Sequence, residues 1–313
     1  MLDRLTGMEV FAEVARQGSL SGAARAVGIS PTMATKHVNA LEDRLGVKLV
    51  HRTTRRVTLT DAGRRYLDQV ERVLSNIAEA EAEAAAERVE VAGQLRVALP
   101  VSFGTRQVAP LLPEFMRAYP RLRVDLGIDD RKVDMVAGGW DVAVRIGHNP
   151  DDTTIARKLA SCRTVVSAAP DYLARHGTPE TVADLGAHNC LSYTLSHDVG
   201  PGRWPFGREG KVAAPVTGNL QADNGDVLVA MALAGQGLIY EPTFIVGDHV
   251  RAGRLEIVLL DHPPAEMPGV YAIYPANRRP SAKVRAFVDF LAEHFGTEPP
   301  WDRDLDLPDA SVT

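Results

Sequence analysis

The sequence predicts a mostly helical winged helix-turn-helix at the N-terminus, followed by a long helix and an α/β region of two lobes. Three observations predict this order. Residues 1–59 hold short helical patterns that end in a basic turn, and residues 60–92 lack proline and are rich in helix-forming residues. Residues 93–296 alternate short apolar runs with helical stretches, which is typical of α/β folds.

Three short helices are expected within the first 46 residues. Apolar side chains at spacings of three and four predict the first helix over residues 5–17. Ser21 is expected to cap a second helix over residues 22–27, because a serine hydroxyl can accept the unpaired amides at a helix start. Ser30 and Pro31 suit the cap and the first turn of a third helix.

The third helix and the chain after it have the pattern of a DNA-binding surface. Polar residues lie off its buried stripe near the N-terminal end, and two strands over residues 47–50 and 56–59 are expected to form a wing with a basic tip. Residues 1–66 carry eleven Lys and Arg against six Asp and Glu, whereas the whole chain has a net charge of −5. The alternative is a solvated basic hairpin on an ordinary helical domain. The predicted DNA-binding residues are Ser30, Pro31, Thr32, Met33, Thr35, Lys36, Asn39, Arg52, Thr53, Thr54, Arg55 and Arg56.

Five sequence runs carry a resemblance to a known family: GSLSGAA at 18–24, ISP at 29–31, LEDRLGVKL at 41–49, RTTRR at 52–56 and LTDAG at 59–63. The chain resembles the LysR-type transcriptional regulators up to about residue 296. The resemblance implies that the third helix enters the major groove, with Thr32, Thr35 and Lys36 near bases and Arg52, Arg55 and Arg56 on the backbone or in the minor groove. Two positions depart from the common pattern: Val50 replaces a usual Phe, and Lys36 replaces a usual Arg, whose two-pronged contact with guanine a lysine cannot make.

Residues 60–92 are expected to form one long linker helix. Leu67, Val70, Leu74 and Ile77 keep a spacing of three and four and predict a seam for a partner helix. A solvated lone helix is the alternative, but it would leave four large apolar side chains in water. The resemblance implies paired linker helices as well. We therefore expect a homodimer through this helix, assembling further into a homotetramer.

The α/β region over residues 93–296 is large enough for two small cores. The resemblance implies two Rossmann-like lobes that the chain crosses twice, with the architecture of periplasmic solute-binding proteins. We expect crossings near residues 161–163 and 264–268. Lobe I would then comprise residues 93–163 and 268–296, and lobe II residues 164–267. Residues 297–313 are acidic and rich in proline, and are expected to form a disordered tail.

Ligands of open α/β sheets bind beyond the carboxyl ends of strands, so residues that directly follow strands are the candidates for an effector site. Amides at a helix start favour anions, which makes a small carboxylate the first expectation for the effector. The resemblance implies that several of these loops face an interlobe cleft that binds small effectors. Each residue also has a plainer interpretation as a helix cap, a surface ion pair or core packing. The predicted effector-binding residues are Ser102, Phe103, Gly104, Arg145, Gly147, Ala168 and Asn224.

Other classes of function find little support in the sequence. The nine histidines form no metal-binding motif, and neither a nucleophile elbow nor a phosphate-binding loop is found, so we expect no enzyme, cofactor or metal. No apolar run is long enough for a membrane span, and the N-terminus does not have the pattern of a secretory signal. Cys162 and Cys190 fit a reducing cytoplasm as buried thiols. A transport receptor that binds a solute and, less favoured, a thiol redox sensor using these cysteines stay open as alternatives.

Overall fold

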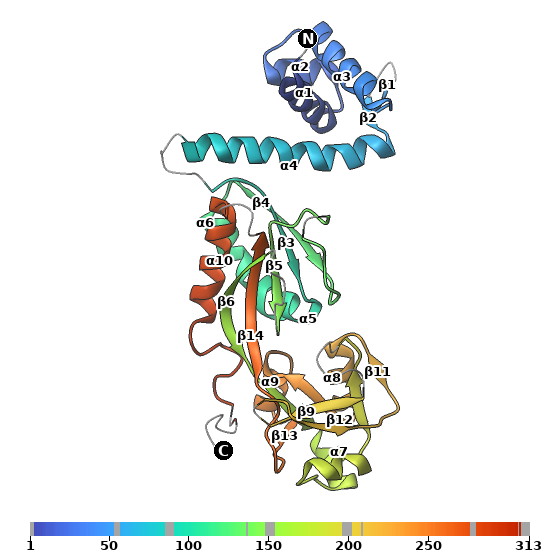
Figure 1. Cartoon of the computed structure of the whole chain (residues 1–313), viewed down its shortest axis with the longest axis vertical. Coiled ribbons are helices and arrows are strands. Elements are labelled where there is room, and N and C mark those ends of the chain that lie inside the picture. Colours follow the sequence, from blue (N-terminus) through green and yellow to red (C-terminus); the bar gives the residue numbers. More distant parts are fainter. Residues whose placement is uncertain are drawn as a thin grey trace. The chain divides into compact units, whose positions relative to one another are not determined.

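The computed structural model describes residues 3–52, 57–84, 91–135, 137–147, 154–195, 202–207, 209–275, 280–305 and 307. The chain divides into two compact units, Met1–Glu90 and Val91–Thr313, which are described separately (Figure 1). The predicted fold class is confirmed, with a winged helix-turn-helix and a long helix in unit 1 and a two-lobed α/β domain in unit 2. Within the described chain, no helix combines the length and the apolar character needed to cross a membrane.

Unit 1 begins with three helices, α1 (Arg4–Gln17), α2 (Leu20–Val27) and α3 (Pro31–Leu45). The hydroxyl of Ser30 accepts the Met33 amide at 3.2 Å and caps α3, as predicted. The predicted cap of α2 is wrong by half a turn. Ser19, not Ser21, accepts the Gly22 amide at 3.2 Å, so the helix begins at Leu20.

The wing consists of β1 (Val50–Arg52) and β2 (Val57–Leu59), which pair antiparallel with Val50 opposite Leu59. The predicted first strand at residues 47–50 is therefore shifted. The cause is the buried carboxylate of Glu42 on α3, which accepts the amides of Leu49 at 2.9 Å and Val50 at 3.2 Å and holds this stretch against the helix. Thr53, Thr54, Arg55 and Arg56 at the predicted tip lie outside the described residues.

The linker helix α4 is described over Asp61–Ala84. The prediction of one helix to residue 92 is too long, because Val91 and Ala92 are not helical and lead into a strand. Val70 is only 1% exposed and belongs to the core of unit 1, and Leu67 and Leu74 pack against the same cluster. Val70 is therefore taken up by the unit's own core and is not available to a partner helix, whereas Leu67, Leu74 and Ile77 stay partly accessible. This core is built around Val10, Phe11, Ala23, Ala24, Ala34, Val38 and Leu41.

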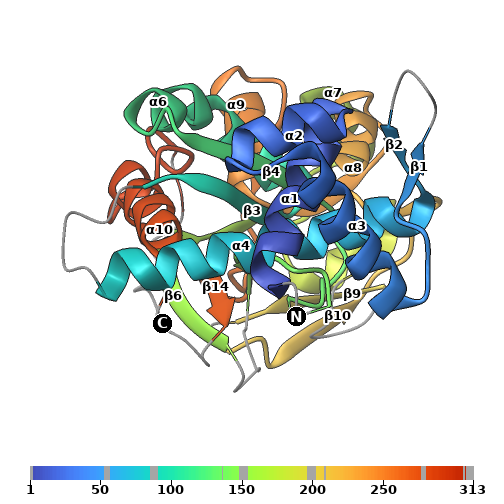
Figure 2. The ribbon, with the colours of Figure 1, turned by 90° about the horizontal axis from the view of Figure 1, so that it is seen from above.

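Lobe I of unit 2 is built on a five-stranded sheet with the order β4-β3-β5-β14-β6. The strand β3 runs parallel to β4 and β5, whereas β14 runs antiparallel to β5 and β6. Helices α6 and α10 lie side by side, as Figures 1 and 2 show, and Phe115 of α6 contacts Phe287 and Phe290 of α10. The elements are β3 (Gly93–Leu99), α5 (Val101–Phe103), η1 (Gly104–Val108), η2 (Ala109–Leu111), α6 (Leu112–Ala118), β4 (Leu122–Ile128), β5 (Val142–Ile146), β6 (Thr154–Cys162), β14 (Met267–Pro275) and α10 (Ala282–Phe295).

Lobe II has a second five-stranded sheet with the order β11-β8-β12-β7-β13, and a separate hairpin of β9 and β10. The chain passes between the lobe sheets at Arg163, between the end of β6 and the start of β7, and returns at Met267 with β14. The elements of lobe II are β7 (Thr164–Ala168), α7 (Pro170–His176), η3 (Val182–Ala187), β8 (Cys190–Tyr193), β9 (Arg203–Phe206), β10 (Val212–Pro215), β11 (Gln221–Ala222), α8 (Gly225–Leu233), β12 (Leu238–Pro242), α9 (Thr243–Arg251) and β13 (Glu256–Val258).

The first part of the predicted disordered tail is folded. Trp301 is 2% exposed and contacts the rings of Phe103, Phe244 and Phe295, so its indole fills a core that residues of both lobes form. The guanidinium of Arg251 on α9 donates to the Trp301 carbonyl at 3.3 Å and to the Arg303 carbonyl at 2.8 Å. Burial of this one aromatic side chain thus holds the segment in place although the residues around it are acidic. Residues 308–313 lie outside the described residues.

Candidate DNA-binding surface and effector site

The exposed face of α3 carries most of the predicted base-reading residues. Thr32 and Lys36 are exposed and Met33 is half-buried. Thr35 is also half-buried and its hydroxyl donates to the Pro31 carbonyl at 3.0 Å. Because the buried stripe of the helix faces the core, this polar face is free for a groove in DNA.

A side-chain contact ties the wing to this helix, which the sequence did not predict. The guanidinium of Arg52 on β1 donates to the side-chain carbonyl of Asn39 on α3 at 2.7 Å. Both residues are predicted to contact DNA, and here each orients the other. The pair fixes the wing strand relative to the middle of α3.

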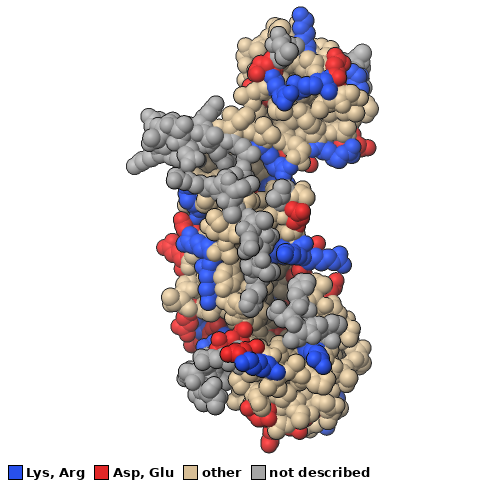
Figure 3. Space-filling model, in the orientation of Figure 1, with Lys and Arg blue, Asp and Glu red and all other residues tan. Residues whose placement is uncertain are grey.

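Lys and Arg side chains lie on the face of unit 1 that Figure 3 shows, with acidic side chains beside them. Arg25, Lys36 and Arg65 are exposed, and the side chain of Lys48 is 71% exposed although its ammonium reaches Glu42. Exposed cations of this kind suit the phosphates of a duplex, whose contacts fix position rather than sequence.

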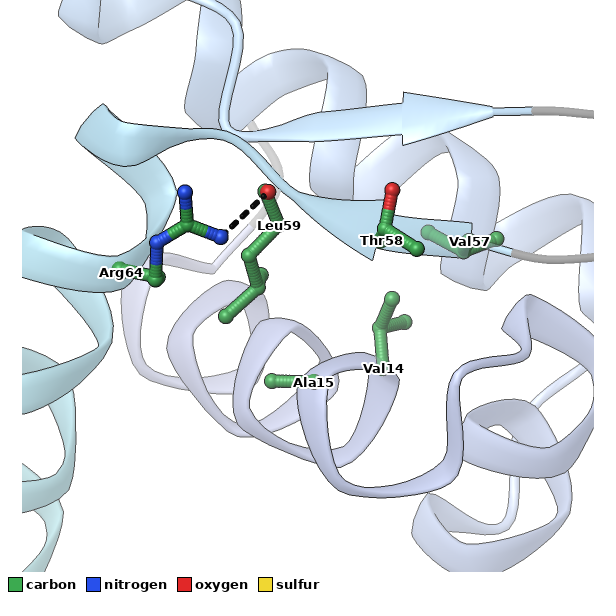
Figure 4. Close-up of a pocket in the computed structure, with 6 residues that line it drawn as sticks. All are labelled: Val14, Ala15, Val57, Thr58, Leu59 and Arg64. Carbon is green, nitrogen blue, oxygen red and sulfur yellow. Dashed lines mark hydrogen bonds between the residues drawn. The ribbon is translucent and has the colours of Figure 1, made fainter.

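A pocket of about 290 Å³ lies behind the wing (Figure 4). Val14 and Ala15 of α1 line it on one side, and β2 lines it on the other with Val57, Thr58 and Leu59. Arg64 of α4 closes one end and donates to the Leu59 carbonyl at 3.2 Å. None of the predicted site residues lines this pocket.

In unit 2, polar side chains from both lobes meet. Ser102 donates to the Asp226 carboxylate at 2.8 Å, and the guanidinium of Arg106 donates to the same carboxylate at 2.8 Å. The Asn224 amide donates to Asp130 at 3.2 Å, and its carbonyl accepts the Asp226 amide at 3.1 Å. We call these five residues the interlobe junction. Ser102 and Asn224 were predicted as site residues, whereas Arg106, Asp130 and Asp226 were missed.

The other predicted effector-binding residues lie elsewhere. Phe103 and Ala168 are fully buried in hydrophobic cores, and Gly104 is packed so closely on Leu99 that a Cβ atom would lie 2.9 Å from the Leu99 side chain. This corrects the prediction that these three contact an effector, and the plainer interpretation as packing is the right one.

Two further predicted residues also have structural roles. The Gly147 amide donates to the Gly269 carbonyl at 3.0 Å, with a left-handed backbone that favours glycine. Arg145 donates to the carbonyls of Arg131 at 3.4 Å and Val133 at 3.2 Å, and burial lowers the pKa of its guanidinium. Both residues thus serve the backbone around them.

Beside the junction lies Glu241, a buried acid that was not predicted as a site residue. Glu241 on β12 is 4% exposed, and its Oε1 atom has no hydrogen-bond partner among the described residues. Burial, with the charges of Asp226 and Asp130, raises the pKa of this carboxyl group to about 8. The only sequence signal is a single acid within the apolar run LIYEPTFIV.

The two thiols are buried in different cores. Cys162 packs in the cluster shared by the lobes and Cys190 in the core of lobe II. Burial raises the pKa of both thiols, that of Cys190 to about 12, so neither is an activated thiolate. Within the described ranges, no group of three or more His, Cys, Asp or Glu residues could hold a metal ion.

Comparisons with known proteins match both parts of the chain. Residues 5–64 match the family described as bacterial regulatory helix-turn-helix protein, lysR family, and residues 88–296 match the LysR substrate binding domain. The HTH-type transcriptional regulator DmlR of Escherichia coli (strain K12) is 36% identical over 300 residues, which cover 96% of this chain and 97% of that protein. An HTH-type transcriptional repressor of Pseudomonas aeruginosa (strain UCBPP-PA14) is 34% identical, over 95% of this chain and 94% of that protein.

Solved structures of the same family resemble the whole chain. CrgA of Neisseria meningitidis, a LysR-type transcriptional regulator, has a TM-score of 0.61 and 29% identity, and the match covers 93% of this chain and 99% of that one. The virulence activator AphB of Vibrio cholerae has a TM-score of 0.57 and 27% identity, over 92% and 98% of the two chains. The chain therefore belongs to the LysR family: it is a DNA-binding transcriptional regulator with an effector-binding domain.

Proposed function

We propose that this regulator binds a double-stranded DNA operator as a homodimer through α3 and the wing, and that a small-molecule effector at the interlobe junction controls the binding. The observation that carries the proposal is the Asp226 carboxylate of lobe II, which the Ser102 hydroxyl and the Arg106 guanidinium of lobe I hold. A ligand that changes these contacts changes how α8 is held against lobe I. A preference of about 1 to 3 kcal/mol for one arrangement is enough for regulation.

A small carboxylate is the effector class that we propose. Ser102 and Arg106 offer the donors that a carboxylate needs, and in this structure they bind the carboxylate of Asp226. An effector carboxylate would compete with Asp226 for the same donors. Its binding would release the N-terminal end of α8 from lobe I.

The dimer would use the part of α4 that the core of unit 1 leaves accessible. Val73 is 40% exposed, and Leu74 and Ile77 are half-buried rather than fully buried. Two recognition helices on one face of DNA reach half-sites about one helical turn apart, which requires a dimer. Two such dimers would form the expected homotetramer, working in the cytoplasm where the operator is accessible.

The alternatives receive less support than regulation by an effector. A transport receptor has no use for the helix-turn-helix that residues 5–64 match. A thiol sensor would need an accessible thiolate, whereas Cys162 and Cys190 are buried and their pKa values are raised. An enzyme would need a nucleophile paired with a base, and the junction donors hold a carboxylate instead.

The test starts with the full chain and DNA fragments that it selects from a genomic library. Footprints and thermal unfolding would be recorded with and without small carboxylates. We expect at least one acid to raise the melting temperature and to change the footprint. Ser102→Ala should weaken both responses because it removes a junction donor. Ser281→Ala is the matched control, since the Ser281 side chain makes no cap hydrogen bond.

Two outcomes would contradict the proposal. One is a footprint and a melting temperature that no acid changes. The other is a response that Ser102→Ala and Ser281→Ala alter equally, because the junction would then have no special part in it.

A further inference from the structure

Glu241 is a buried carboxyl group that the surrounding protein leaves incompletely bonded. It lies on β12, is 4% exposed, and its Oε1 atom has no partner among the described residues. The other oxygen, Oε2, would lie 2.8 Å from a Cβ atom placed on Gly225, so the carboxyl group sits against the first turn of α8. A buried polar atom without a partner is unfavourable and marks a place where a ligand atom could bind.

The groups around Glu241 disfavour its ionised form. Burial raises its pKa, and the charges of Asp226 on α8 and Asp130 after β4 raise it further. Tyr193 on β8 is the third titratable neighbour; burial raises the pKa of its phenol, and the charges of Asp130, Glu241 and Asp223 add to that shift. Arg106 on η1 is bound to Asp226. With a pKa of about 8, Glu241 is mostly a neutral acid at pH 7 and has an O–H donor to offer.

The donors at the interlobe junction share one preference. The Ser102 hydroxyl, the Arg106 guanidinium and the Asn224 amide all donate to carboxylate oxygens at the junction. A ligand that replaces Asp226 there must therefore bring acceptor oxygens of its own. Because Asp226 lies next along the chain to Gly225, against which the Glu241 carboxyl group packs, such a ligand would come within reach of that group.

We propose that Glu241 belongs to the effector site and donates a hydrogen bond, as a neutral carboxylic acid, to an acceptor oxygen of a small organic acid. The inference rests on the proposed function and deepens it, since it adds a residue that favours ligands with an acceptor oxygen, such as small organic acids. The alternative ligand class, an organic cation, would need Glu241 to lose its proton beside two other carboxylates. The two classes predict opposite effects of pH on binding.

The experiment measures the affinity of the full chain for three matched pairs of acids: propionate and lactate, succinate and malate, benzoate and salicylate. Calorimetric titrations would run from about pH 7 to 9.5, where the carboxyl groups of these probes stay ionised. We expect at least one acid to bind, with an affinity that is constant below the pKa of Glu241. Above about pH 8 the affinity should fall, approaching tenfold per pH unit, because only the protonated form donates.

Two substitutions of Glu241 distinguish its hydrogen-bond donor from other causes of a pH-dependent affinity. Glu241→Gln keeps an N–H donor that does not titrate, so binding should persist and the fall above pH 8 should disappear. Glu241→Leu removes the donor and should weaken binding by about tenfold. Glu256→Gln on β13 is the matched control, because Glu256 is exposed on the same sheet, and it should leave the pH profile unchanged. If Glu241→Leu does not fold, the profile of Glu241→Gln still decides.

Three results would overturn the inference: an affinity that rises with pH, as a cation would give; a fall above pH 8 that Glu241→Gln retains; or no binding of any of the six acids. Footprinting keeps this failure apart from failure of the proposed function. An acid that binds with the expected pH profile but does not change the footprint contradicts regulation while the Glu241 site stands. A footprint that an acid changes equally in wild type and in Glu241→Leu contradicts only the role of Glu241.

Discussion

The carboxylate of Glu42 fixes where the first strand of the wing begins after the recognition helix α3. Its side chain is 2% exposed and accepts the amides of Leu49 and Val50 as well as the Lys48 ammonium at 2.7 Å. Burial opposes its ionisation, but these three donors prevail and lower its pKa. The sequence LEDRLGVKLV shows the acid, yet the contact spans seven and eight residues across a turn. That is why the strand start was misplaced.

Glu42→Ala should destabilise unit 1 by about 1 to 3 kcal/mol, because two buried amides lose their acceptor. The pKa of Glu42 is lower in the folded protein than its ordinary value of 4.5. This stabilisation is therefore fully present above pH 4.5 and is lost as the pH falls through the pKa of the folded state. Urea unfolding between about pH 3 and 7 would measure both effects. Glu9→Ala on the exposed side of α1 is the control; equal losses in the two variants would contradict the assigned role.

Lys36 should affect the choice of DNA sequence more than total affinity. It is exposed on α3, off the buried stripe, whereas Arg52 lies on the wing and contacts Asn39. Lys36→Ala should reduce the ratio of operator to random-DNA affinity by about tenfold, as expected for the loss of a base contact. Arg52→Ala should weaken binding to both kinds of DNA. Fluorescence titrations would measure this, and equal losses in Lys36→Ala would argue against base readout.

At the scale of elements, the positions of the helices in unit 1 were predicted well. The residue that caps α2 and the surface against which α4 packs were predicted less well. Apolar spacing and the predicted cap at Ser30 locate the start of α3, and Gly46, with its left-handed backbone, ends it; these signals are local. Ser19 and Ser21 are both acceptable caps by composition, and only the backbone of the turn decides between them. The stripe of α4 was recognised, but spacing alone does not tell whether a stripe faces its own domain or a second copy. Val70 faces the core of its own unit, whereas Val73, four-tenths exposed, stays available to a second copy.

Val70 and Val73 lie on different faces of α4, so substituting them should have different effects on stability and on dimerisation. Val70→Ala opens a cavity in the core of unit 1 and should lower the free energy of unfolding by about 1 to 3 kcal/mol. Val73→Asp changes an exposed side chain and should leave that stability nearly unchanged while it weakens the dimer. Light scattering and thermal unfolding would follow both. A dimer that Val73→Asp leaves intact would refute this part of the interface.

At the scale of the molecule, alternating strands and helices predicted the α/β class and the family resemblance implied the two lobes, but neither predicted the junction. Ser102 and Asp226 are 124 residues apart, and nothing in either local sequence names the other as its partner. The role of Trp301 was missed for a related reason, because the acidic composition around it suggested disorder. Contacts between distant segments depend on how the lobes pack, which residue patterns do not encode locally.

Trp301 should be important for the stability of unit 2 as a whole. Its indole contacts Phe103 and Phe295 of lobe I and Phe244 of lobe II. Trp301→Ala should lower the free energy of unfolding by about 3 to 5 kcal/mol, in the range known for large aromatic side chains. Leu259→Ala is the control, since Leu259 is 62% exposed. Urea unfolding followed by circular dichroism would show it, and a loss below about 1 kcal/mol would contradict the packing role.

The Asp226 contact has a consequence for how much effector is needed. Asp226 is part of the same chain as Ser102 and Arg106, so it competes for their donors at an effective concentration that is millimolar or above. If the effector is an acid that displaces Asp226, as proposed, it must bind these donors much better than a simple carboxylate, or accumulate to comparable levels. The tether would then set a threshold: common metabolic acids at low concentration would not change DNA binding, and only an abundant or closely fitting acid would do so.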